Sequence, residues 1–578
     1  MSEVSPASSP QRETAPQSRN RIVDFVSSPR LILLALLLTF SVYARTLSYP
    51  FVFDDTMQIV GNRHIMYSGY VHTYFTQDVW SHMPGKHLDG YYRPLLLLWF
   101  RLNYLLFGDN SSLWHLSTVL VHLVGVVLVY FLALKFVPDR ITAFLAAALF
   151  ALHPVQVEAT AWVSGVNGSL CGVLVLAAFL AYLQFKSSGR YLWLAASLAS
   201  FALALLAKES AIPFAAVILA YEWTLGSKRY RWAGAYLLIS IVYWMVRAHA
   251  LATSFPDTSG RPLLPALLSL PWLLCIYIRM LVLPTKLAVF YDFDYVRHLG
   301  DPRLWLPLLA FAAAFVVLLK RRKAIFLAAW FLLFLAPAFA YVYVSMSGET
   351  YNGRHLYLPC VAFSIVVAAA ARRLHARAVL AVLILALIPV TWMQTGYWAN
   401  SRRLFAHTYE VSPTSYLAAA TYMDQLIPER QYREAIAVGR AALSHHPGQP
   451  VLIERVAQSE FLAGQYDSAA TDFETVTAAL PSRPDVWFRL GFSYLYLGRN
   501  ADAAHVLRQA VQLDDEQAAY HYELGVALAN LGQQSDALAE VTKAVALAGD
   551  SRIGEAYTPK LKLLKDSVHL QAKRGTLP

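Results

Sequence analysis

The sequence has few charged residues and few cysteines. Asp, Glu, Lys and Arg make up 15% of its 578 residues, whereas a soluble globular domain carries about 25%. The three cysteines lie in or beside apolar runs, and an odd number in such positions excludes a disulfide framework and a zinc site. Because hydrophobic residues make up 57% of the chain, the composition indicates an integral membrane protein and excludes a disordered or fibrous chain.

Several common functional motifs are absent as well. The sequence has no Walker A loop, no dinucleotide-binding fingerprint, no nucleophile elbow and no His-Glu-x-x-His. These absences argue against a nucleotide-driven pump. We attribute the formal net charge of +11 to Lys and Arg in cytoplasmic loops. No basic stripe with interleaved aromatic residues occurs outside those loops, so no nucleic-acid partner is expected.

The sequence does contain a long series of apolar runs between residues 31 and 398. Most are close to the ~17–25 residues that a helix needs to cross a bilayer, and none alternates as a barrel strand does. About eleven spans result if the proline-rich run 262–278 is broken or re-entrant. The polar residues 1–29 are interpreted as a disordered cytoplasmic tail, with a signal peptide over 1–44 as the alternative.

Five basic loops set the predicted orientation. By the positive-inside rule these loops are cytoplasmic. The loop after the first span, the turn at Lys208 and everything after residue 398 then face outward. The basic loops lie at 135–140, 186–190, 228–231, 320–323 and 372–377.

The second part of the chain repeats with a period of 34 residues. A glycine at the end of the first helix and an alanine in the second are typical of tetratricopeptide (TPR) repeats at this period. We expect about four repeats over 401–550 and a capping helix and tail over 551–578; an unrelated helical bundle is the alternative. The residues in register are Gly464, Gly498 and Gly532, and Ala435, Ala469, Ala503 and Ala537.

Charged residues in the outward loops are the candidate site residues. Asp54 and Asp55 follow the first span, where paired carboxylates can act as a general base or bind a metal. The structural alternative is a helix N-cap. His153 and Glu158 lie at an outer helix end, where ionisable residues are costly. A structural cap at the neighbouring proline is the alternative there.

Two further pairs complete the candidates. Lys208 and Glu209 stand between two apolar runs, either as a self-neutralising pair or as a phosphate contact with an orienting carboxylate. Arg354 and His355 precede another apolar run, where an arginine suits a lipid phosphate. Interfacial snorkelling is the alternative for Arg354.

The order of these motifs resembles the C-type glycosyltransferase (GT-C) superfamily. It is closer still to the transmembrane and TPR repeat-containing proteins and their bacterial relatives, over essentially the whole chain after residue 30. This chain departs from the family at Val166, where a polar residue is frequent, and at Gly353, where an acid often precedes the arginine. The matching motifs are Phe-Asp-Asp at 53–55, Tyr-Arg-Pro at 92–94, His-Pro-Val-x-x-Glu-Ala-x-Ala-Trp-Val-Ser-Gly at 153–165, Lys-Glu at 208–209 and Arg-x-Leu-Tyr-Leu-Pro at 354–359.

The resemblance implies an all-α fold, with a polytopic GT-C-like helix bundle over 30–400 followed by a TPR α-solenoid. It also implies inverting transfer of a sugar from a polyprenyl-phosphate-linked donor to a hydroxyl acceptor, expected to be a protein, on the outer face. Asp54 or Asp55 would be the general base. Asp55 is favoured because it is farther from the apolar residues 51–53.

The remaining candidates would bind substrate by the same resemblance. Lys208 and Arg354 would contact the donor phosphate, and His355 is a secondary candidate for that contact. The expected substrate-binding residues are therefore His153, Glu158, Lys208, Glu209, Arg354 and His355.

No cofactor is expected, and a divalent cation at Asp54 and Asp55 is the alternative. The expected partners are the polyprenyl-phosphate sugar, an acceptor protein or peptide presented by the TPR array, and the lipid bilayer. We expect a bacterial inner membrane with the repeats in the periplasm; an ER membrane with lumenal repeats is the alternative. Two other functions stay open: an inactive membrane scaffold that recruits partners through its repeats, and a transporter of lipid-linked glycans.

Overall fold

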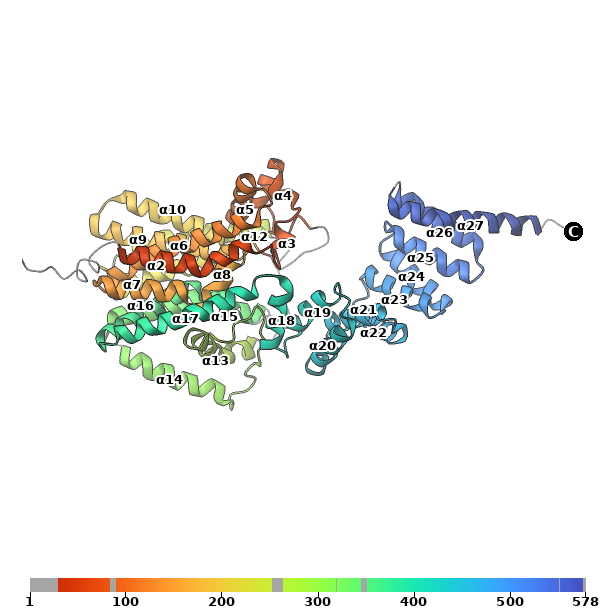
Figure 1. The fold of residues 1–578 in the computed structure, drawn as a ribbon. Helices are drawn as coiled ribbons and strands as arrows, with labels where there is room; N and C mark the ends of the chain where they lie inside the picture. Colours follow the sequence, from red (N-terminus) through yellow and green to blue (C-terminus); the bar gives the residue numbers. More distant parts are fainter. Residues whose placement is uncertain are drawn as a thin grey trace, which may run out of the picture.

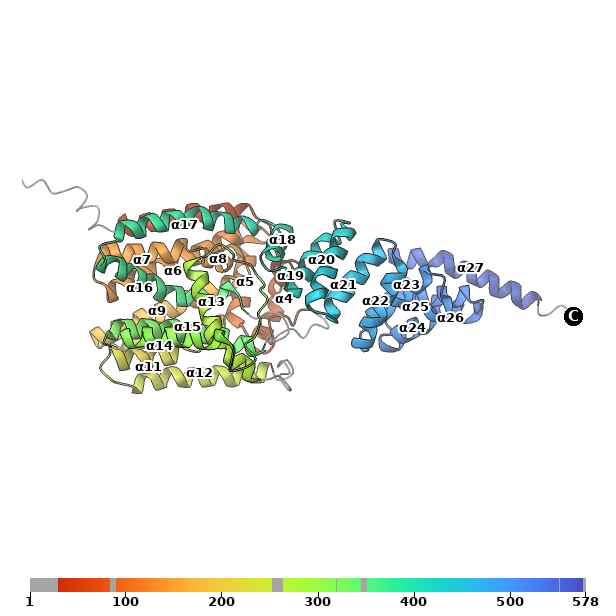
Figure 2. The same ribbon diagram turned by 90° about the horizontal axis from the view of Figure 1, so that it is seen from below.

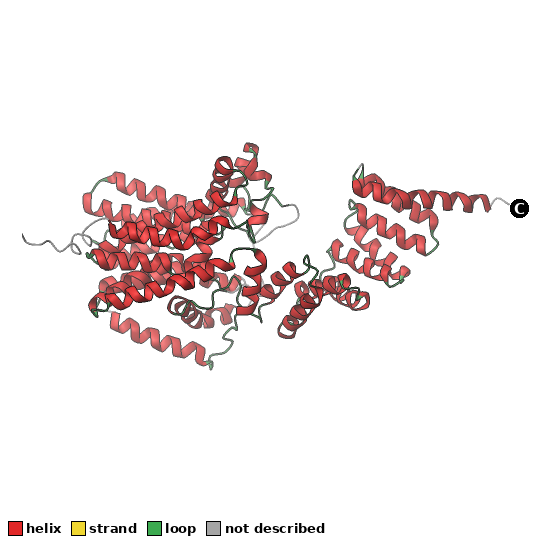
Figure 3. Ribbon diagram, in the orientation of Figure 1, coloured by secondary structure: helices red, strands yellow, loops and turns green. Residues whose placement is uncertain are grey.

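The computed structural model describes residues 30–83, 90–251, 263–318, 320–344, 351–549 and 551–574. The tail expected over 1–29 lies outside these residues. Every regular element within them is a helix, which confirms the expected all-α fold. Figures 1 and 3 show two helical units in a row, a bundle of roughly parallel helices and a solenoid of helix pairs.

Within the described residues, eight helices are long and apolar enough to cross a membrane, or nine if the bent pair Arg140–Leu152 and Pro154–Ala161 is one span. Shorter apolar helices pack among them, so the count is close to the eleven expected, and the chain is a membrane protein. The longer helices are α2 (Arg30–Tyr43, extended to Ser48 by a 3-10 turn), α6 (Ser111–Phe136), α9 (Val166–Ser188), α12 (Arg231–Ala250), α13 (Leu263–Val282), α15 (Arg322–Val344), α16 (Tyr357–Arg373) and α17 (Arg377–Tyr397). The shorter ones include α5 (Pro94–Phe107), α7 (Arg140–Leu152), α8 (Val157–Ala161), α10 (Tyr191–Ala207), α11 (Phe214–Thr224) and α14 (Pro302–Leu318).

The run 262–278, which was expected to be broken or re-entrant, forms helix α13 and is not broken. It is one continuous helix that contains Pro271. Figure 2 shows it running across the other bundle helices rather than along them. The loop that follows is tied back to its middle, because the Val296 backbone N–H donates to the Ser269 hydroxyl at 2.8 Å.

The basic loops gather at one end of the bundle. The Lys323 ammonium donates to the carbonyl of Phe136 at 2.7 Å, and Arg377 pairs with Asp139 at 3.5 Å. These contacts join the loops 135–140, 320–323 and 372–377. Figure 1 shows the turns between α6 and α7, α9 and α10, and α16 and α17 at the end opposite the solenoid. The first outward loop and the start of the solenoid lie at the other end.

The solenoid consists of four helix pairs after the linking helix α18 (Ser401–Val411). Gly464, Gly498 and Gly532 adopt φ values of 81°, 71° and 79° in the turn between the helices of three pairs, which a side chain would strain. Gly491 lies where two helices touch, since a Cβ there would come within 2.5 Å of Leu507. The pairs are α19 (Tyr416–Leu426) with α20 (Tyr432–His445), α21 (Pro450–Leu462) with α22 (Tyr466–Ala479), α23 (Pro484–Tyr496) with α24 (Asn500–Leu513), and α25 (Ala518–Asn530) with α26 (Gln534–Ala548), followed by α27 (Arg552–Arg574).

The two largest apolar cores lie one after the other along these units. One runs through the bundle and continues through α18 into the first helix pair, where it includes Phe405, Met423 and Val438. The other fills the later pairs, from Ile453 to Leu564. The first helix pair is therefore packed onto the membrane unit, and the junction between them is a defined surface.

Candidate functional site

A cavity of about 240 Å³ opens at the solenoid end of the bundle. Its walls come from segments that are far apart in the sequence and meet where several helices end. Five of the eight predicted site residues line it, namely Asp54, Lys208, Glu209, Arg354 and His355. The fold therefore brings a carboxylate of the first loop together with the cationic residues of two later motifs.

Asp54 reaches the cavity from a strained turn. The residue before it, Phe53, has φ of +55°, a left-handed value that is uncommon for a residue other than glycine. Its ring packs against Trp162, Phe290 and Phe405 at centroid distances of 5.4, 5.9 and 5.4 Å. This aromatic contact holds the turn, and such strain is typical of functional sites.

Asp55 lies in the wall of the site and not in the cavity. It begins the short helix α3 (Asp55–Gln58) and is fully buried. One carboxylate oxygen accepts from the Ser164 backbone N–H at 2.7 Å and the other from the Val52 N–H at 3.2 Å. Burial outweighs these bonds and raises the pKa of Asp55 to about 6. Of the two aspartates, Asp54 lines the cavity, whereas Asp55, which the sequence favoured as the base, does not.

The second wall carries Lys208 and an ion pair. Glu209 accepts two hydrogen bonds from the Arg93 guanidinium, at 2.6 and 3.1 Å. Burial disfavours the charged carboxylate, but Arg93 outweighs it and lowers the pKa of Glu209 to about 2. Burial, and then the charge of Arg93, lower the pKa of Lys208 to about 8. Since Arg93 and Glu209 neutralise each other, Lys208 supplies the net positive charge of this wall.

Arg93 also lines the cavity, but sequence reasoning did not place it in the site. It occurs in Tyr-Arg-Pro at 92–94, one of the motifs that carry the family resemblance. That motif directly precedes the apolar helix α5 and faces outward. A single arginine beside an apolar run in an outward loop was the sequence feature that could have identified Arg93 as a candidate.

Arg354 is oriented by two neighbours. Its Nε lies 3.7 Å from a carboxylate oxygen of Glu158, and its guanidinium lies 5.9 Å from the centre of the Trp162 ring. A Cβ at Gly353 would come within 3.3 Å of the other Glu158 oxygen. A side chain at position 353 would therefore lie close to Glu158, and in this chain Glu158 supplies the carboxylate beside Arg354.

The start of α16 is held by Tyr357, whose ring fits a notch between α6 and α9. A Cβ at Gly172 would come within 2.4 Å of this ring, and one at Gly125 within 2.7 Å of its hydroxyl. That hydroxyl lies 3.1 Å from Nδ1 of His122. Because His355 lies on the turn just before Tyr357, the notch fixes the position of this cavity wall.

His153 does not line the cavity. Its Nδ1 accepts from the Val155 backbone N–H at 3.3 Å, and its Nε2 lies 2.8 Å from the carbonyl oxygen of Leu281. These contacts cap the turn after α7 and join it to α13. The structural cap, which was the alternative from the sequence, describes this placement better than a substrate contact does.

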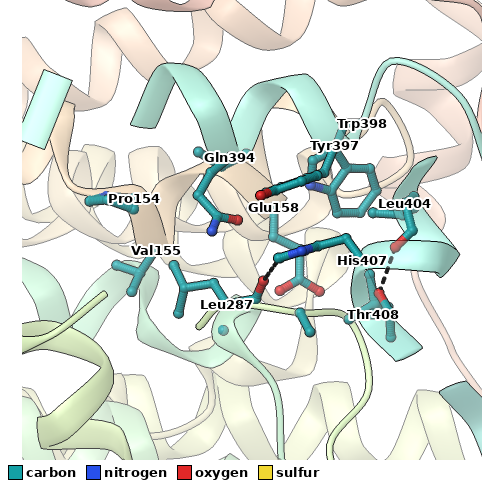
Figure 4. A pocket seen from close by; sticks show the side chains of 14 residues that line it. Pro154, Val155, Glu158, Leu287, Gln394, Tyr397, Trp398, Leu404, His407 and Thr408 are labelled. Carbon is teal, nitrogen blue, oxygen red and sulfur yellow. Dashed lines mark hydrogen bonds between the residues drawn. The ribbon is translucent and has the colours of Figure 1, made fainter. Parts of the chain in front are cut away.

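Glu158 faces a small neighbouring cavity of about 30 Å³ as well as Arg354. Figure 4 shows this cavity, where Glu158, Gln394 and His407 meet between the bundle and α18. His407 Nε2 lies 3.0 Å from the carbonyl oxygen of Leu287. Glu158 thus contacts Arg354 from behind the main cavity and is not part of its lining.

The two aspartates do not converge on one point, since one faces the cavity and the other its wall. In the part of the chain that the structure describes, no group of three or more His, Cys, Asp and Glu side chains is placed to hold a metal ion. A divalent cation at this pair stays an untested alternative to metal-free chemistry.

Comparison with known proteins found one matching family model and several relatives. A family model for tetratricopeptide repeats matches residues 460–521. Protein O-mannosyl-transferase TMTC3 of Homo sapiens is 36% identical over 185 residues, which are 31% of this chain and 20% of that protein. Its Mus musculus counterpart is 33% identical over 258 residues, 44% of this chain and 27% of that protein.

A third relative and one solved structure were also matched. Protein O-mannosyl-transferase Tmtc1 of Drosophila melanogaster is 34% identical over 178 residues, 30% of this chain and 20% of that protein. The solved structure MamA 41-end from Desulfovibrio magneticus RS-1 is 22% identical, with a TM-score of 0.25, and covers 26% of this chain and 85% of that chain. The matched region thus spans about a fifth to a quarter of the curated relatives. The comparisons confirm the resemblance predicted from the motifs: over 30–44% of its length the chain is similar to these transmembrane and TPR repeat-containing proteins.

Proposed function

We propose that the cavity transfers a sugar from a polyprenyl-phosphate-linked donor to a hydroxyl group of a protein acceptor. The relatives that this chain matches are named protein O-mannosyl-transferases. The observation that carries the proposal is the placement of Asp54 in one cavity with Lys208 and Arg354. A carboxylate and two cations are what this reaction requires of a protein.

The chemistry needs one base and one anion site. A hydroxyl is a poor nucleophile at neutral pH, so Asp54 accepts its proton as the oxygen attacks the anomeric carbon. The bond between that carbon and the phosphate oxygen breaks, and its electron pair stays on the phosphate. Lys208 and Arg354 stabilise the departing anion. This single displacement inverts the anomeric centre, as in GT-C enzymes.

The remaining residues position these three. Asp55 fastens the first loop to the segment before α9, and the pair of Arg93 and Glu209 holds the wall that carries Lys208. Glu158 orients Arg354, and His355 is a further phosphate contact. A phosphate leaving group requires no acid, so we propose transfer without a metal ion.

We assign transfer to residues 30–400 and presentation of the acceptor to the repeats over 401–550. The cavity and the solenoid lie at the bundle end opposite the basic loops. The positive-inside rule places those loops in the cytoplasm. We therefore propose a bacterial inner membrane with the cavity and repeats in the periplasm; the corresponding face in an ER membrane is the lumen.

The test is reconstitution of the full chain in lipid nanodiscs with labelled polyprenyl-phosphate mannose and envelope proteins as acceptors. Glycopeptide mass spectrometry should find mannose on Ser or Thr, and Asp54→Asn should abolish the product. Asp109→Asn is the matched control, because Asp109 is exposed between α5 and α6, outside the cavity lining.

Three results would contradict the proposal. Equal product with Asp54→Asn and Asp109→Asn would exclude Asp54 as the base. Movement of intact lipid-linked sugar across the bilayer without glycoprotein would indicate the transporter. If the repeats recruit partner proteins but no sugar is transferred under any condition, the chain is an inactive membrane scaffold.

A further inference from the structure

A second, larger cavity lies at the junction between the bundle and the solenoid. It is an open groove of about 770 Å³. One wall is made by the outward ends of α2 and α17, which contribute Arg45 and Tyr397, and the others by α18 and by α19 and α20. Figures 1 and 2 both show α18 and α19 directly after the end of α17. The groove shares no residue with the proposed transfer machinery.

Charges of both signs line the groove. The two cations are Arg45 and Arg403, and the two carboxylates are those of Glu410 and Glu434. The Glu410 side chain is 82% exposed and that of Glu434 is 47% exposed, so both can meet a ligand from solvent. A ligand that carries an anion and a cation a few atoms apart complements this lining.

The groove lies at the depth of lipid headgroups. With 21 residues, α17 spans about 30 Å, so Tyr397 lies at the membrane surface opposite the basic loop before Arg377. The Arg45 guanidinium stacks 4.5 Å from the Trp392 ring centre and 5.8 Å from that of Tyr49. Tryptophan, tyrosine and arginine together are typical of the membrane interface.

The surface below the groove faces lipid. In α2 and α17 only 33% and 28% of the spanning window is buried inside the protein. Leu37 of α2 and Leu385 of α17 are among the large apolar side chains exposed there. The groove is therefore continuous with a surface suited to acyl chains, which favours a lipid over a polypeptide as its occupant.

We propose that the groove binds a zwitterionic aminophospholipid of the outward leaflet. The phosphate lies between Arg45 and Arg403, the ammonium group lies toward Glu410 and Glu434, and the acyl chains run along α2 and α17. Because the headgroup would touch both the bundle and the first helix pair, the lipid fastens the solenoid to the membrane surface. This site does not depend on the chemistry of the transfer cavity.

The test uses the full chain in nanodiscs made from equal parts of phosphatidylethanolamine, phosphatidylglycerol and phosphatidylcholine. Native mass spectrometry after mild extraction counts the lipids that stay bound. Phosphatidylethanolamine should be retained, and the double variant Arg45→Gln, Arg403→Gln should lower its retention about tenfold or more, since two charge-assisted contacts are lost. The matched control is Arg433→Gln, Arg508→Gln, which removes two exposed arginines outside the groove.

A second arm tests the carboxylates through lipid preference and does not depend on total binding. The variant Glu410→Gln, Glu434→Gln should shift the choice from phosphatidylethanolamine toward phosphatidylglycerol, which has no ammonium group. Wild type should also prefer phosphatidylethanolamine to phosphatidylcholine, because a trimethylammonium group cannot donate hydrogen bonds.

Three outcomes would overturn the proposal. Equal retention by the groove variant and its control would show that the arginines do not bind lipid. An unchanged lipid preference after the glutamate substitutions would show that Glu410 and Glu434 do not bind the ammonium group, and would exclude a site for a zwitterionic headgroup. Retained lipid together with lost binding of acceptor protein in the arginine variant would make the groove a polypeptide site.

Discussion

Asp54 and Asp55 are neighbours in the chain, but their carboxylates lie in different surroundings. Asp54 lines the cavity, whereas Asp55 is buried and bound by two backbone N–H groups. The turn at Phe53 separates them, because its left-handed backbone directs one carboxylate outward and the next into the wall. Adjacent acids at a site can thus divide the chemical and the positioning roles.

The asparagine variants of this pair should therefore differ in kind. Asp54→Asn keeps size but cannot take a proton, so we expect a loss of roughly 10²–10⁴-fold in transfer rate with an unchanged melting temperature. Asp55→Asn has one oxygen for two N–H donors and leaves a buried donor without a partner, at a cost of about 1–3 kcal/mol. Its melting temperature and activity should fall together. Single-turnover transfer and thermal unfolding measure the two effects.

The opposite pattern would reverse the two roles. If Asp55→Asn loses rate at an unchanged melting temperature while Asp54→Asn stays active, Asp55 is the base. Activity that EDTA removes and a divalent cation restores would instead assign the pair to a metal ion.

Lys208 should make donor binding depend on pH. Burial and the nearby Arg93 charge lower its pKa to about 8, and the lysine carries its charge below that value. As pH rises from 7 to 9 the ammonium is lost and the donor KM should increase, because a phosphodiester does not change its own charge in this range. Lys208→Arg stays charged and should show a flat donor KM over the same range. Identical pH profiles for the two proteins would show that Lys208 does not contact the donor.

Charge in an apolar setting was enough to select residues that lie together in the fold, since five of the eight candidates line one cavity. The direction of each side chain could not be predicted from the sequence. The difference between Asp54 and Asp55 depends on one backbone turn. The placement of His153 depends on its contact with the carbonyl of Leu281, 128 residues away. Neither contact leaves a local pattern in the sequence.

At the scale of the helix, the prolines of α13 do not break it, so the broken alternative for this run was wrong. Pro265 lies in the first turn, where a missing N–H removes no helical hydrogen bond. Only Pro271 lies inside the helix. A single internal proline can be tolerated as a kink, so three nearby prolines do not by themselves break a helix.

The notch that seats Tyr357 makes a prediction about α9 and α16. Gly172→Ala places a methyl group within 2.4 Å of the Tyr357 ring, which is itself buried. Overpacking of this kind costs about 1–3 kcal/mol. We expect the start of α16 to shift, with Arg354 and His355, so that the donor KM rises more than kcat falls.

Gly234→Ala is the matched control, since a Cβ at this glycine of α12 meets nothing within 4 Å. It should leave the kinetics unchanged. Adding Tyr357→Leu to Gly172→Ala should restore part of the donor KM, because the shorter side chain leaves room for the methyl group. A loss of protein stability with an unchanged donor KM would show that the notch contributes to folding and not to donor binding.

At the scale of the whole molecule, the two units were predictable to different degrees. The 34-residue register is repeated, so each helix pair supports the assignment of the next. The bundle has no such redundancy. Its span lengths follow from hydropathy, but the helix that lies across it and the groove at the junction arise from packing between distant segments, as between Arg45 and the carbonyl of Trp392.

The orientation of the molecule gives the last prediction. Basic loops gather at one end of the bundle, and the transfer cavity and solenoid lie at the other. Moving Lys and Arg across a membrane is unfavourable, so the basic end should remain in the cytoplasm. Alkaline phosphatase fused after α27 should be active and a fluorescent protein fused there dark. Fusions in the loop between α16 and α17 should show the reverse. A bright fusion after α27 would place the cavity on the cytoplasmic face, where a donor in the outer leaflet could not reach Lys208 and Arg354.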